Sequence, residues 1–447
     1  MNPEIYREYD IRGVIGKDIA EEEFIVLGKG FGTYFNGLGK KNIVLGRDCR
    51  LSSPKIKDEL IEGLISAGCN VIDGGVCPTP TLYFAIRHLK VDGGVMITAS
   101  HNPPDYNGFK ICSGFDTIYG EEIQQVRRLI EGEDFAKGRG AYSSADIIEP
   151  YIAMIEENIK KVPGIKVGFD AGNGTGGPVG MRVLKSLGCE IHGLYCDMDG
   201  SFPNHEPDPT VLDNMRDLIE EVKGHNLDLG IGVDGDADRI GVIDSAGNVI
   251  FGDMLLLIFA RDVLAEHPGA TIISEVKCSD RMYNDISAHG GNGIMWKTGH
   301  SLIKNKMKET KALLAGEMSG HMFFADRYFG YDDAIYASCR LLEILSKTGK
   351  SIGQLLENVP KSHTTPEIRV ECPDSEKFKL VNTLKDEFDK KYKTIDVDGV
   401  RVVFDDGWGL VRASNTQPAL VLRFEARTEA RLEEIRAIIE GAIAEFM

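Results

Sequence analysis

A serine and a histidine follow directly after an apolar run, in residues 98–103, which read Thr-Ala-Ser-His-Asn-Pro. The run itself, residues 94–97, is typical of a buried parallel strand. The carboxyl ends of such strands are where open α/β sheets bind their ligands. A serine in a polar turn is commonly a turn residue and nothing more. Ser100 therefore becomes a candidate nucleophile only in the company of further chemical groups.

Three carboxylates stand at alternate positions in residues 234–239, which read Asp-Gly-Asp-Ala-Asp-Arg. Carboxylate oxygens on one side of an extended turn suit Mg²⁺, which combines few carboxylates with a phosphate oxygen. The alternative is a solvated acidic hairpin turn, which the apolar residues 229–233 and 240–243 on either side disfavour. An EF-hand fits poorly, because its sixth position would be Arg239 instead of glycine and its twelfth Ser245 instead of glutamate.

Two later segments could bind an anion and a polar ligand. Residues 412–416, Arg-Ala-Ser-Asn-Thr, supply a guanidinium fork, hydroxyls and turn amides, and such a loop can hold a phosphate dianion. Residues 316–321, Gly-Glu-Met-Ser-Gly-His, form a polar cluster. Residues 170–177 resemble a nucleotide loop but match neither the dinucleotide fingerprint nor the P-loop. We interpret them as a structural strand-to-helix turn.

In this order, the four segments strongly resemble the α-D-phosphohexomutase family, and the resemblance spans the whole chain from residues 6–13 onward. It implies that Ser100 is a phosphoserine. The implied metal site consists of Ser100, Asp234, Asp236 and Asp238 around Mg²⁺. The implied catalytic residues are Ser100, Arg12, Lys110, His300 and Arg239. The implied substrate-binding residues are Tyr9, Lys277, Glu317, Ser319, His321, Arg412, Ser414, Asn415 and Thr416.

The resemblance also implies how these residues divide the work. The Arg412 loop would hold the phosphate that does not react, and Glu317 with Ser319 would read adjacent ring hydroxyls. Arg12 and Arg239 are best interpreted as charge stabilisers. The group that handles the proton stays open between Lys110, His300 and Arg12, and Lys110 would need a lowered pKa to act as a base.

The implied activity interconverts hexose 1-phosphate and hexose 6-phosphate, of mannose, glucose or both. A bound 1,6-bisphosphate would be the intermediate and the activator. One alternative is a phosphoglucosamine mutase, which Met318 disfavours because such relatives usually carry glutamine there. Others are a catalytically silent sensor of sugar phosphates and a metal-dependent phosphatase. The phosphatase would have no reason for a second phosphate site such as the Arg412 loop.

The segments that must position these groups follow one repeated pattern: a short apolar strand, a turn and an amphipathic helix. This alternation predicts βαβ crossovers and α/β folding. After residue 361 the pattern changes to a helix, paired strands near 400–404 and 420–424, and a closing helix from about Thr428. We expect three related α/β domains with mixed, mostly parallel sheets and a C-terminal α+β domain around a central active-site cleft. The expected ranges are 1–146, 147–248, 249–360 and 361–447.

Composition limits the partners and the compartment. The chain of 447 residues carries a formal net charge of −18, which disfavours nucleic acid and anionic membrane as partners. A small phosphosugar would need a local positive pocket. Nine cysteines without a C-x-x-C pair suggest reduced thiols, and the chain has no leader pattern and no long apolar run. We expect a cytoplasmic protein, and the sequence leaves its oligomeric state open.

Overall fold

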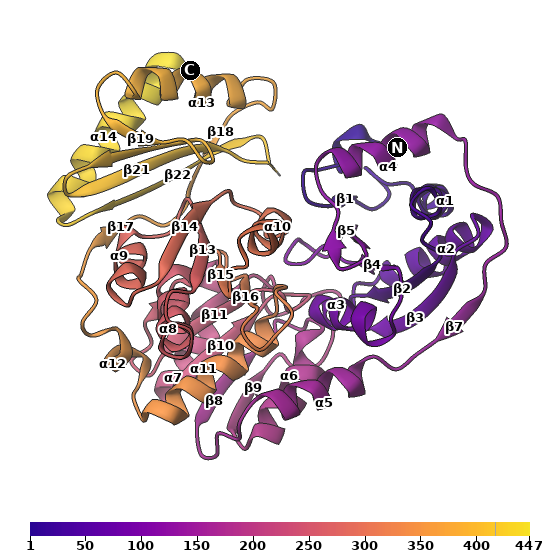
Figure 1. Cartoon of the computed structure of the whole chain (residues 1–447), viewed down its shortest axis with the longest axis horizontal. Helices are drawn as coiled ribbons and strands as arrows, with labels where there is room; N and C mark the ends of the chain where they lie inside the picture. Colours follow the sequence, from indigo (N-terminus) through magenta and orange to yellow (C-terminus); the bar gives the residue numbers. More distant parts are fainter. Residues whose placement is uncertain (416) are drawn as a thin grey trace.

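The computed structural model describes residues 1–415 and 417–447, which form four successive sheets flanked by helices (Figure 1). We call each sheet with its helices a unit and number the units in chain order. The first three units are α/β layers with mixed sheets and the fourth is α+β, so the fold class expected from the sequence is confirmed. The alternation of short apolar strands and amphipathic helices accounts for this layering.

The first unit presents the serine loop from the middle of its sheet. The strand order is β1-β5-β4-β2-β3-β7, so β4 is an interior strand and its carboxyl end faces the centre of the molecule. Its strands are β1 (Ile11–Val14), β2 (Asn42–Arg47), β3 (Asn70–Val76), β4 (Gly93–Ile97), β5 (Tyr106–Ser113), β6 (Asp116–Thr117) and β7 (Tyr142–Ser144). Its helices are α1 (Phe24–Gly37), α2 (Ser53–Ser66), α3 (Thr79–His88) and α4 (Glu121–Gly132).

The second unit carries the triple-carboxylate loop between two antiparallel strands. The strand order is β12-β11-β10-β8-β9, with β8, β9 and β10 parallel. Its strands are β8 (Lys166–Asp170), β9 (Glu190–Leu194), β10 (Leu229–Val233), β11 (Ile240–Asp244) and β12 (Val249–Ile250). Its helices are α5 (Ile148–Asn158), α6 (Gly176–Leu187) and α7 (Arg216–His225).

The third unit presents residues 316–321 at the turn between its last two strands. The strand order is β14-β13-β15-β16, in which only β16 is antiparallel to its neighbour. Its strands are β13 (Thr271–Glu275), β14 (Asn292–Trp296), β15 (Leu314–Gly316) and β16 (Met322–Phe324). Its helices are α8 (Gly252–Glu266), α9 (Asp280–Ala288), α10 (His300–Thr310), α11 (Ala334–Thr348) and α12 (Ile352–Leu356).

The fourth unit differs in two details from the sequence expectation. Two short strands precede its first helix, and β21 lies between the strands expected to pair directly, so that the order is β17-β22-β21-β20-β19. The closing helix does begin beside Thr428, which caps it. Its elements are β17 (His363–Thr364), β18 (Ile368–Glu371), α13 (Lys377–Phe388), β19 (Lys393–Ile395), β20 (Val400–Phe404), β21 (Gly407–Ala413), β22 (Ala419–Ala426) and α14 (Glu429–Phe446).

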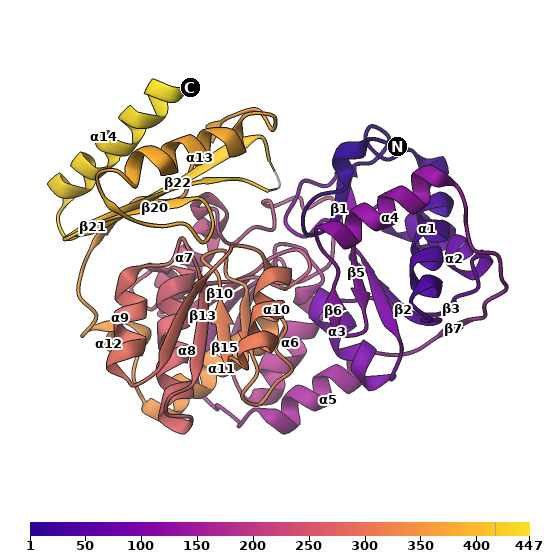
Figure 2. The same cartoon turned by 45° about the horizontal axis from the view of Figure 1, so that its top comes forward.

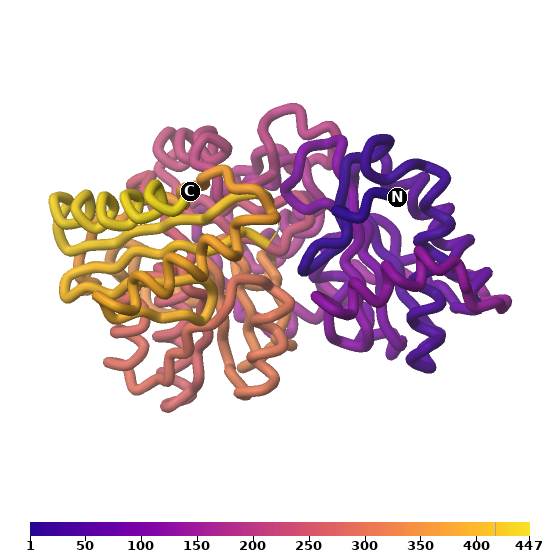
Figure 3. Tube along the Cα trace, turned by 90° about the horizontal axis from the view of Figure 1, so that it is seen from above, coloured from indigo at the N-terminus to yellow at the C-terminus, as the bar shows by residue number. Residues whose placement is uncertain are grey.

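The four units bring distant parts of the chain to one central region. In Figures 1 and 2 the first and fourth units stand at opposite ends, above the second and third, and α13 and α14 cover the outer face of the last sheet. Figure 3 shows the same arrangement from above. The second and third units share one apolar core with α3, whereas the first and fourth have cores of their own. Within the described ranges, no helix combines the length and apolar character that crossing a bilayer requires.

Candidate active site

Ser100 lies just beyond the end of β4 with its hydroxyl aimed at the second unit. Its side chain is buried, and Oγ donates to Asp234 Oδ2 at 2.7 Å and lies 3.0 Å from His101 Nδ1. The backbone has φ +51°, which is uncommon for a residue with a side chain and persists where the surroundings enforce it. The strained turn therefore holds one hydroxyl in one direction.

Arg50 braces this turn, and the sequence analysis did not single it out. Its side chain is 1% exposed, and its guanidinium donates to the backbone oxygens of Ser100 at 2.8 Å and Asn102 at 2.6 Å. Asp48 accepts from Arg50 Nε at 3.0 Å and fixes the guanidinium plane. The place of Arg50 three residues after the end of β2 at Arg47 was the only local signal. Its role depends on the parallel pairing of β2 with β4.

The three carboxylates of the second unit converge in the loop between β10 and β11. Asp234, Asp236 and Asp238 are all fully buried and lie close enough together to share one ion. Asp234 Oδ1 accepts the backbone N–H groups of Asp238 at 2.9 Å and Arg239 at 3.0 Å. These bonds wrap the loop around Asp234, which also accepts from Ser100. The triplet and the serine, 134 residues apart, thus form one cluster.

Within the described residues, the cluster has carboxylate oxygens without hydrogen-bond partners, as a site for a divalent cation would. The Oδ1 atoms of Asp236 and Asp238 are buried and have no hydrogen-bond partner in the described part of the chain. Burial and the neighbouring charges of Asp238 and Asp236 raise the pKa of Asp234 well above its usual range. Buried carboxylates that repel one another need a cation to balance them, and an all-oxygen set is the donor type that Mg²⁺ takes.

Lys110 provides part of that balance. Its Nζ donates to Asp236 Oδ2 at 2.7 Å and to Asp238 Oδ2. Burial alone would lower the pKa of Lys110, but these two carboxylates outweigh it and raise the pKa above its usual range. In this arrangement Lys110 is an ammonium ion, which is the opposite of the lowered pKa that a base would need.

Two histidines stack beside the triplet. The rings of His300 and His321 lie 5.6 Å apart and nearly parallel, and both approach Asp332. Arg239 Nε lies 3.1 Å from His321 Nε2. Burial and the charge of Lys304 lower the pKa of His300 well below its usual range, so its imidazole is neutral.

Arg12 approaches the serine loop from β1. Its Nη1 donates to Asn102 Oδ1 at 2.5 Å, and its other terminal nitrogen pairs with Asp10. Arg12 and Arg50 therefore both hold Asn102, Arg12 through the side chain of Asn102 and Arg50 through its backbone carbonyl. The structure thus brings a second guanidinium to the segment that contains Ser100.

Glu317 and Ser319 lie at the turn after β15. Glu317 is buried, accepts the backbone N–H of Gly299 at 2.7 Å, and has a pKa raised by burial. Ser319 is half-buried. The fully buried Glu275, which the sequence analysis missed, accepts from Thr298 Oγ1 at 3.0 Å and from the backbone of this turn at Met318 at 3.2 Å.

The fourth unit reaches the same region through Arg412. The Arg412 guanidinium is buried and donates to Asp398 Oδ2 at 2.9 Å, and Asp398 also accepts the backbone N–H of Thr298 at 3.1 Å. From the third unit, Lys277 Nζ donates to Glu367 Oε2 at 3.0 Å and lies close enough to Arg412 for the two charges to repel each other. The Arg412 loop and Lys277 thus bring cations from two units to one place.

The rest of the Arg412 loop contacts the first unit. Asn415 Nδ2 donates to Tyr9 Oη at 2.6 Å, and Tyr9 Oη donates to the Thr298 carbonyl at 2.7 Å. Lys377, unnoticed in the sequence, donates to the carbonyl of Ser414. Thr416, the last residue expected in this loop, lies outside the described residues.

The chain has three α/β units and one α+β unit around a serine, three carboxylates and an arginine loop. This is the arrangement expected of a phosphosugar mutase. Family profiles match the chain in the same order: phosphoglucomutase/phosphomannomutase alpha/beta/alpha domain I at residues 3–137, domain II at 149–247, domain III at 251–363, and the C-terminal domain at 367–442. The chain belongs to the phosphoglucomutase/phosphomannomutase family.

Individual relatives agree over nearly the full length. The chain is 47% identical to the phosphomannomutase/phosphoglucomutase of Pseudomonas aeruginosa over 440 residues, which cover 98% of this chain and 95% of that protein. It is 45% identical to the phosphoglucomutase of Neisseria gonorrhoeae over 447 residues, covering 98% and 97%. The crystal structure of a family protein from Burkholderia thailandensis superposes with a TM-score of 0.94 at 41% identity, covering 100% of this chain and 98% of that one. The predicted family is confirmed.

Proposed function

We propose that this protein interconverts hexose 1-phosphate and hexose 6-phosphate, of mannose, glucose or both, through phosphoserine 100 and a bound 1,6-bisphosphate. The observation that carries the proposal is the buried Ser100 hydroxyl, 2.7 Å from a carboxylate of a cluster with two unmet oxygens. The relatives' names support the substrate class. The proposal includes Mg²⁺ and an activating hexose 1,6-bisphosphate.

In the first half-reaction, the bond between phosphorus and Ser100 Oγ breaks, Oγ takes up a proton, and the phosphoryl group bonds to the free hydroxyl of the bound monophosphate, which loses its proton. The resulting bisphosphate turns over, and its other phosphoryl group returns to Ser100 Oγ. Mg²⁺ held by Asp234, Asp236 and Asp238 would neutralise charge on the phosphoryl oxygens. Arg12 and Arg239 would stabilise the same charge from the protein side.

The attacking hydroxyl needs a proton acceptor. His300 is the stronger candidate, because its lowered pKa leaves a neutral imidazole. We assign Lys110 to charge balance beside the metal.

Substrate contacts would come from the third and fourth units and from Tyr9. Arg412, Ser414, Asn415 and Thr416 would hold the phosphate that does not react, with Lys277 and His321 lining the pocket. Glu317 and Ser319 would bind ring hydroxyls. We further propose domain ranges of 1–146, 147–248, 249–360 and 361–447 and a cytoplasmic location, which the free thiols of all nine cysteines support.

A coupled assay on glucose, mannose and glucosamine 1-phosphates, with Mg²⁺ and a trace of the matching 1,6-bisphosphate, tests the proposal. We expect kcat/KM values for glucose and mannose within about 100-fold of each other, because they differ only at C2 and a pocket without a bond to that hydroxyl rejects its epimer weakly. A preference for glucosamine would favour the phosphoglucosamine mutase alternative. Tight sugar-phosphate binding without turnover would favour a silent sensor.

A further inference from the structure

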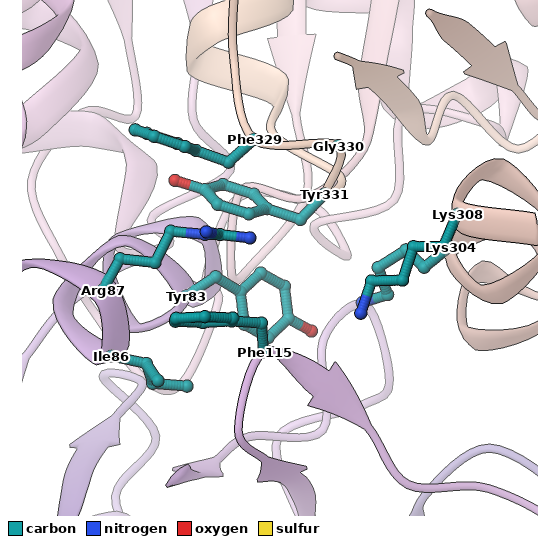
Figure 4. Close-up of a pocket in the computed structure, with 9 residues that line it drawn as sticks. All are labelled: Tyr83, Ile86, Arg87, Phe115, Lys304, Lys308, Phe329, Gly330 and Tyr331. Atoms are coloured by element: carbon teal, nitrogen blue, oxygen red, sulfur yellow. The ribbon is translucent and has the colours of Figure 1, made fainter. Parts of the chain in front are cut away.

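A cavity outside the proposed active site lies between the first and third units (Figure 4). Its free space, including the open mouth, is about 340 Å³. One wall comes from α3 and the β5–β6 turn of the first unit, and the other from α10 and the loop after β16 of the third. Of its lining residues, only Lys304 has a part in the proposed active site, through its charge beside His300. The cavity lining includes Tyr83, Arg87, Phe115, Lys308 and Phe329.

Arg87 brings a positive charge without a counterion. Its guanidinium lies 3.8 Å from the ring centre of Phe115 and 5.3 Å from that of Phe329, both partly exposed. Across residues 1–415 and 417–447, no carboxylate pairs with this guanidinium. Burial lowers the pKa of Arg87, which shows that its surroundings disfavour the cation. Such a group gains more from an anion than an exposed arginine does.

Lys308 adds a second cation from the opposite wall. Its ammonium pairs with Asp116 at the cavity edge. Even so, burial and the charge of Arg87 lower the pKa of Lys308. The two cations therefore repel each other across the cavity. A negative charge between them would relieve that repulsion.

Tyr83 supplies an unused donor in the same wall. Its side chain is 5% exposed, and its hydroxyl makes no hydrogen bond of normal geometry among the described residues, although the Thr117 hydroxyl is near. A buried donor without a partner is unfavourable, because it has lost its hydrogen bonds to water. The Tyr83 oxygen has almost no accessible surface, so an anion accepts this bond once the wall around Tyr83 opens slightly. The cavity thus offers two cations and a hydroxyl donor between aromatic walls.

We propose that this cavity binds the phosphate or carboxylate group of a small molecule through Arg87, Lys308 and the hydroxyl of Tyr83. The aromatic rings lie over the Arg87 guanidinium and leave its N–H groups free for charge-assisted hydrogen bonds. Because the two walls belong to different units, the bound anion holds the first and third units together. The site is separate from the Arg412 loop and does not depend on the proposed reaction.

The test follows the unfolding temperature against the concentration of inorganic phosphate, and separately of acetate, without Mg²⁺. Arg412→Gln serves as the background, because it weakens the other proposed phosphate site. We expect a saturable rise in Tm that survives in this background. Adding Arg87→Gln should weaken the apparent affinity at least about tenfold. Adding Arg128→Gln, which removes an exposed arginine paired with Glu121, is the matched control and should change nothing.

Tyr83→Phe tests whether the Tyr83 hydroxyl binds the anion or the side chain only packs in the wall. It should leave the anion-free protein as stable as before or more stable, because an unpaired hydroxyl disappears, and yet weaken the anion response. A response abolished by Arg412→Gln alone, or unaltered by Arg87→Gln, would overturn the proposal. If Arg87→Gln fails to fold, crystals of the wild type soaked in selenate decide. Anomalous density beside Arg87 and Tyr83 supports the site, and its absence refutes it.

Discussion

At the scale of single residues, the candidate site depends on one hydroxyl that the backbone holds in an unfavourable conformation. Ser100 with φ +51° places Oγ against Asp234, and Arg50 pins the carbonyls on both sides of His101. A free serine is a weak nucleophile. The same oxygen becomes useful as a phosphoryl carrier next to a cation site. Two predictions belong to this scale.

Ser100→Ala should lower turnover at least about 10³-fold, a loss of about 4 kcal/mol of transition-state stabilisation, because the phosphoryl carrier is removed. Coupled kinetics and intact-protein mass measure the effect. The wild type should show a phosphate adduct that the variant lacks. Ser66→Ala, which removes a helix-surface hydroxyl bonded to Gly63, is the control. Wild-type turnover in Ser100→Ala would contradict the assignment.

Asp236→Asn should raise the Mg²⁺ concentration needed for half-maximal activity and lower the maximum, without unfolding the chain. One carboxylate of three is neutralised, which reduces affinity for a hard cation and also reduces repulsion among the buried charges. Activity titrations with Mg²⁺ and thermal unfolding measure the two effects. Asp58→Asn on the exposed face of α2 should leave both unchanged. Full activity of Asp236→Asn in excess chelator would refute the metal site.

At the scale of elements, the site depends on turns that let two units approach closely. Gly299 precedes α10 with φ +133°, and a Cβ there would lie 2.5–2.9 Å from atoms of the Tyr9 ring. Gly290, in the turn before β14, has φ +77° but open space around it. Both glycines have positive φ, and only at Gly299 would an added methyl also meet Tyr9.

Gly299→Ala should lower kcat/KM at least about tenfold, because the added methyl pushes Tyr9 away from Thr298 and disturbs the contact between the first and third units. Gly290→Ala should lower stability by about 1 kcal/mol through strain alone and leave kcat/KM unchanged. Steady-state kinetics and urea unfolding of both variants measure this. Equal kinetic effects of the two substitutions would contradict the steric argument.

Asp333 caps α11 and joins it to α5. It accepts the backbone N–H of Tyr336 at 2.8 Å and the hydroxyls of Tyr151 and Tyr328 at 2.8 and 2.6 Å. Burial raises the pKa of Asp333 from 3.8 to about 6, although these bonds favour the carboxylate. The native state therefore holds its proton more tightly than the unfolded state does. Stability should fall as pH rises from about 4 to about 6.

Asp333→Asn removes this titration. The unfolding free energy of the wild type minus that of the variant should decrease by up to about 3 kcal/mol between pH 4 and pH 7, the value of about two pKa units. The constant loss of hydrogen bonds in the variant does not affect this slope. Urea unfolding at pH 4, 5, 6 and 7 measures it. A difference independent of pH would show that Asp333 titrates at its ordinary pKa.

At the scale of the whole molecule, the two proposed phosphate sites lie on different units. Ser100 belongs to the first and Arg412 to the fourth, and Asp398 and Asn415 tie the fourth unit to Thr298 and Tyr9. The bisphosphate must change orientation without escaping. A loop on a separate unit can hold one phosphate while the other reacts, and can open to let the sugar turn.

Arg412→Ala should weaken substrate and bisphosphate binding together and release bisphosphate to solution. Activity should then depend more steeply on added 1,6-bisphosphate than in the wild type. Phosphorylation of Ser100 by saturating bisphosphate should survive better than the full cycle. Quenched-flow detection of the released intermediate and mass measurement of phosphoserine test this. Abolished phosphorylation with an unchanged KM would instead place Arg412 in the chemical step.

Local pattern was enough to predict most of the elements and to single out most of the residues that we propose for the site. The apolar run before Ser100, the alternate carboxylates between apolar residues, and the cap at Thr428 are each encoded within about ten residues. Strand and helix periods, turn residues and ligand type all act at that range. The family resemblance then linked the four segments, and the comparisons confirm that family.

Only the tertiary structure determined which residues hold the site loops in place and which side chains are charged. Arg50, Glu275 and Lys377 are ordinary residues in the sequence, and their bonds to the loops arise only from packing between strands and units. The protonated Lys110 and the neutral His300 likewise follow from burial beside particular partners. The insertion of β21 between two expected partners has the same origin. Strand pairing, burial and the balance of charges depend on residues that are far apart in the sequence, so no local pattern predicts them.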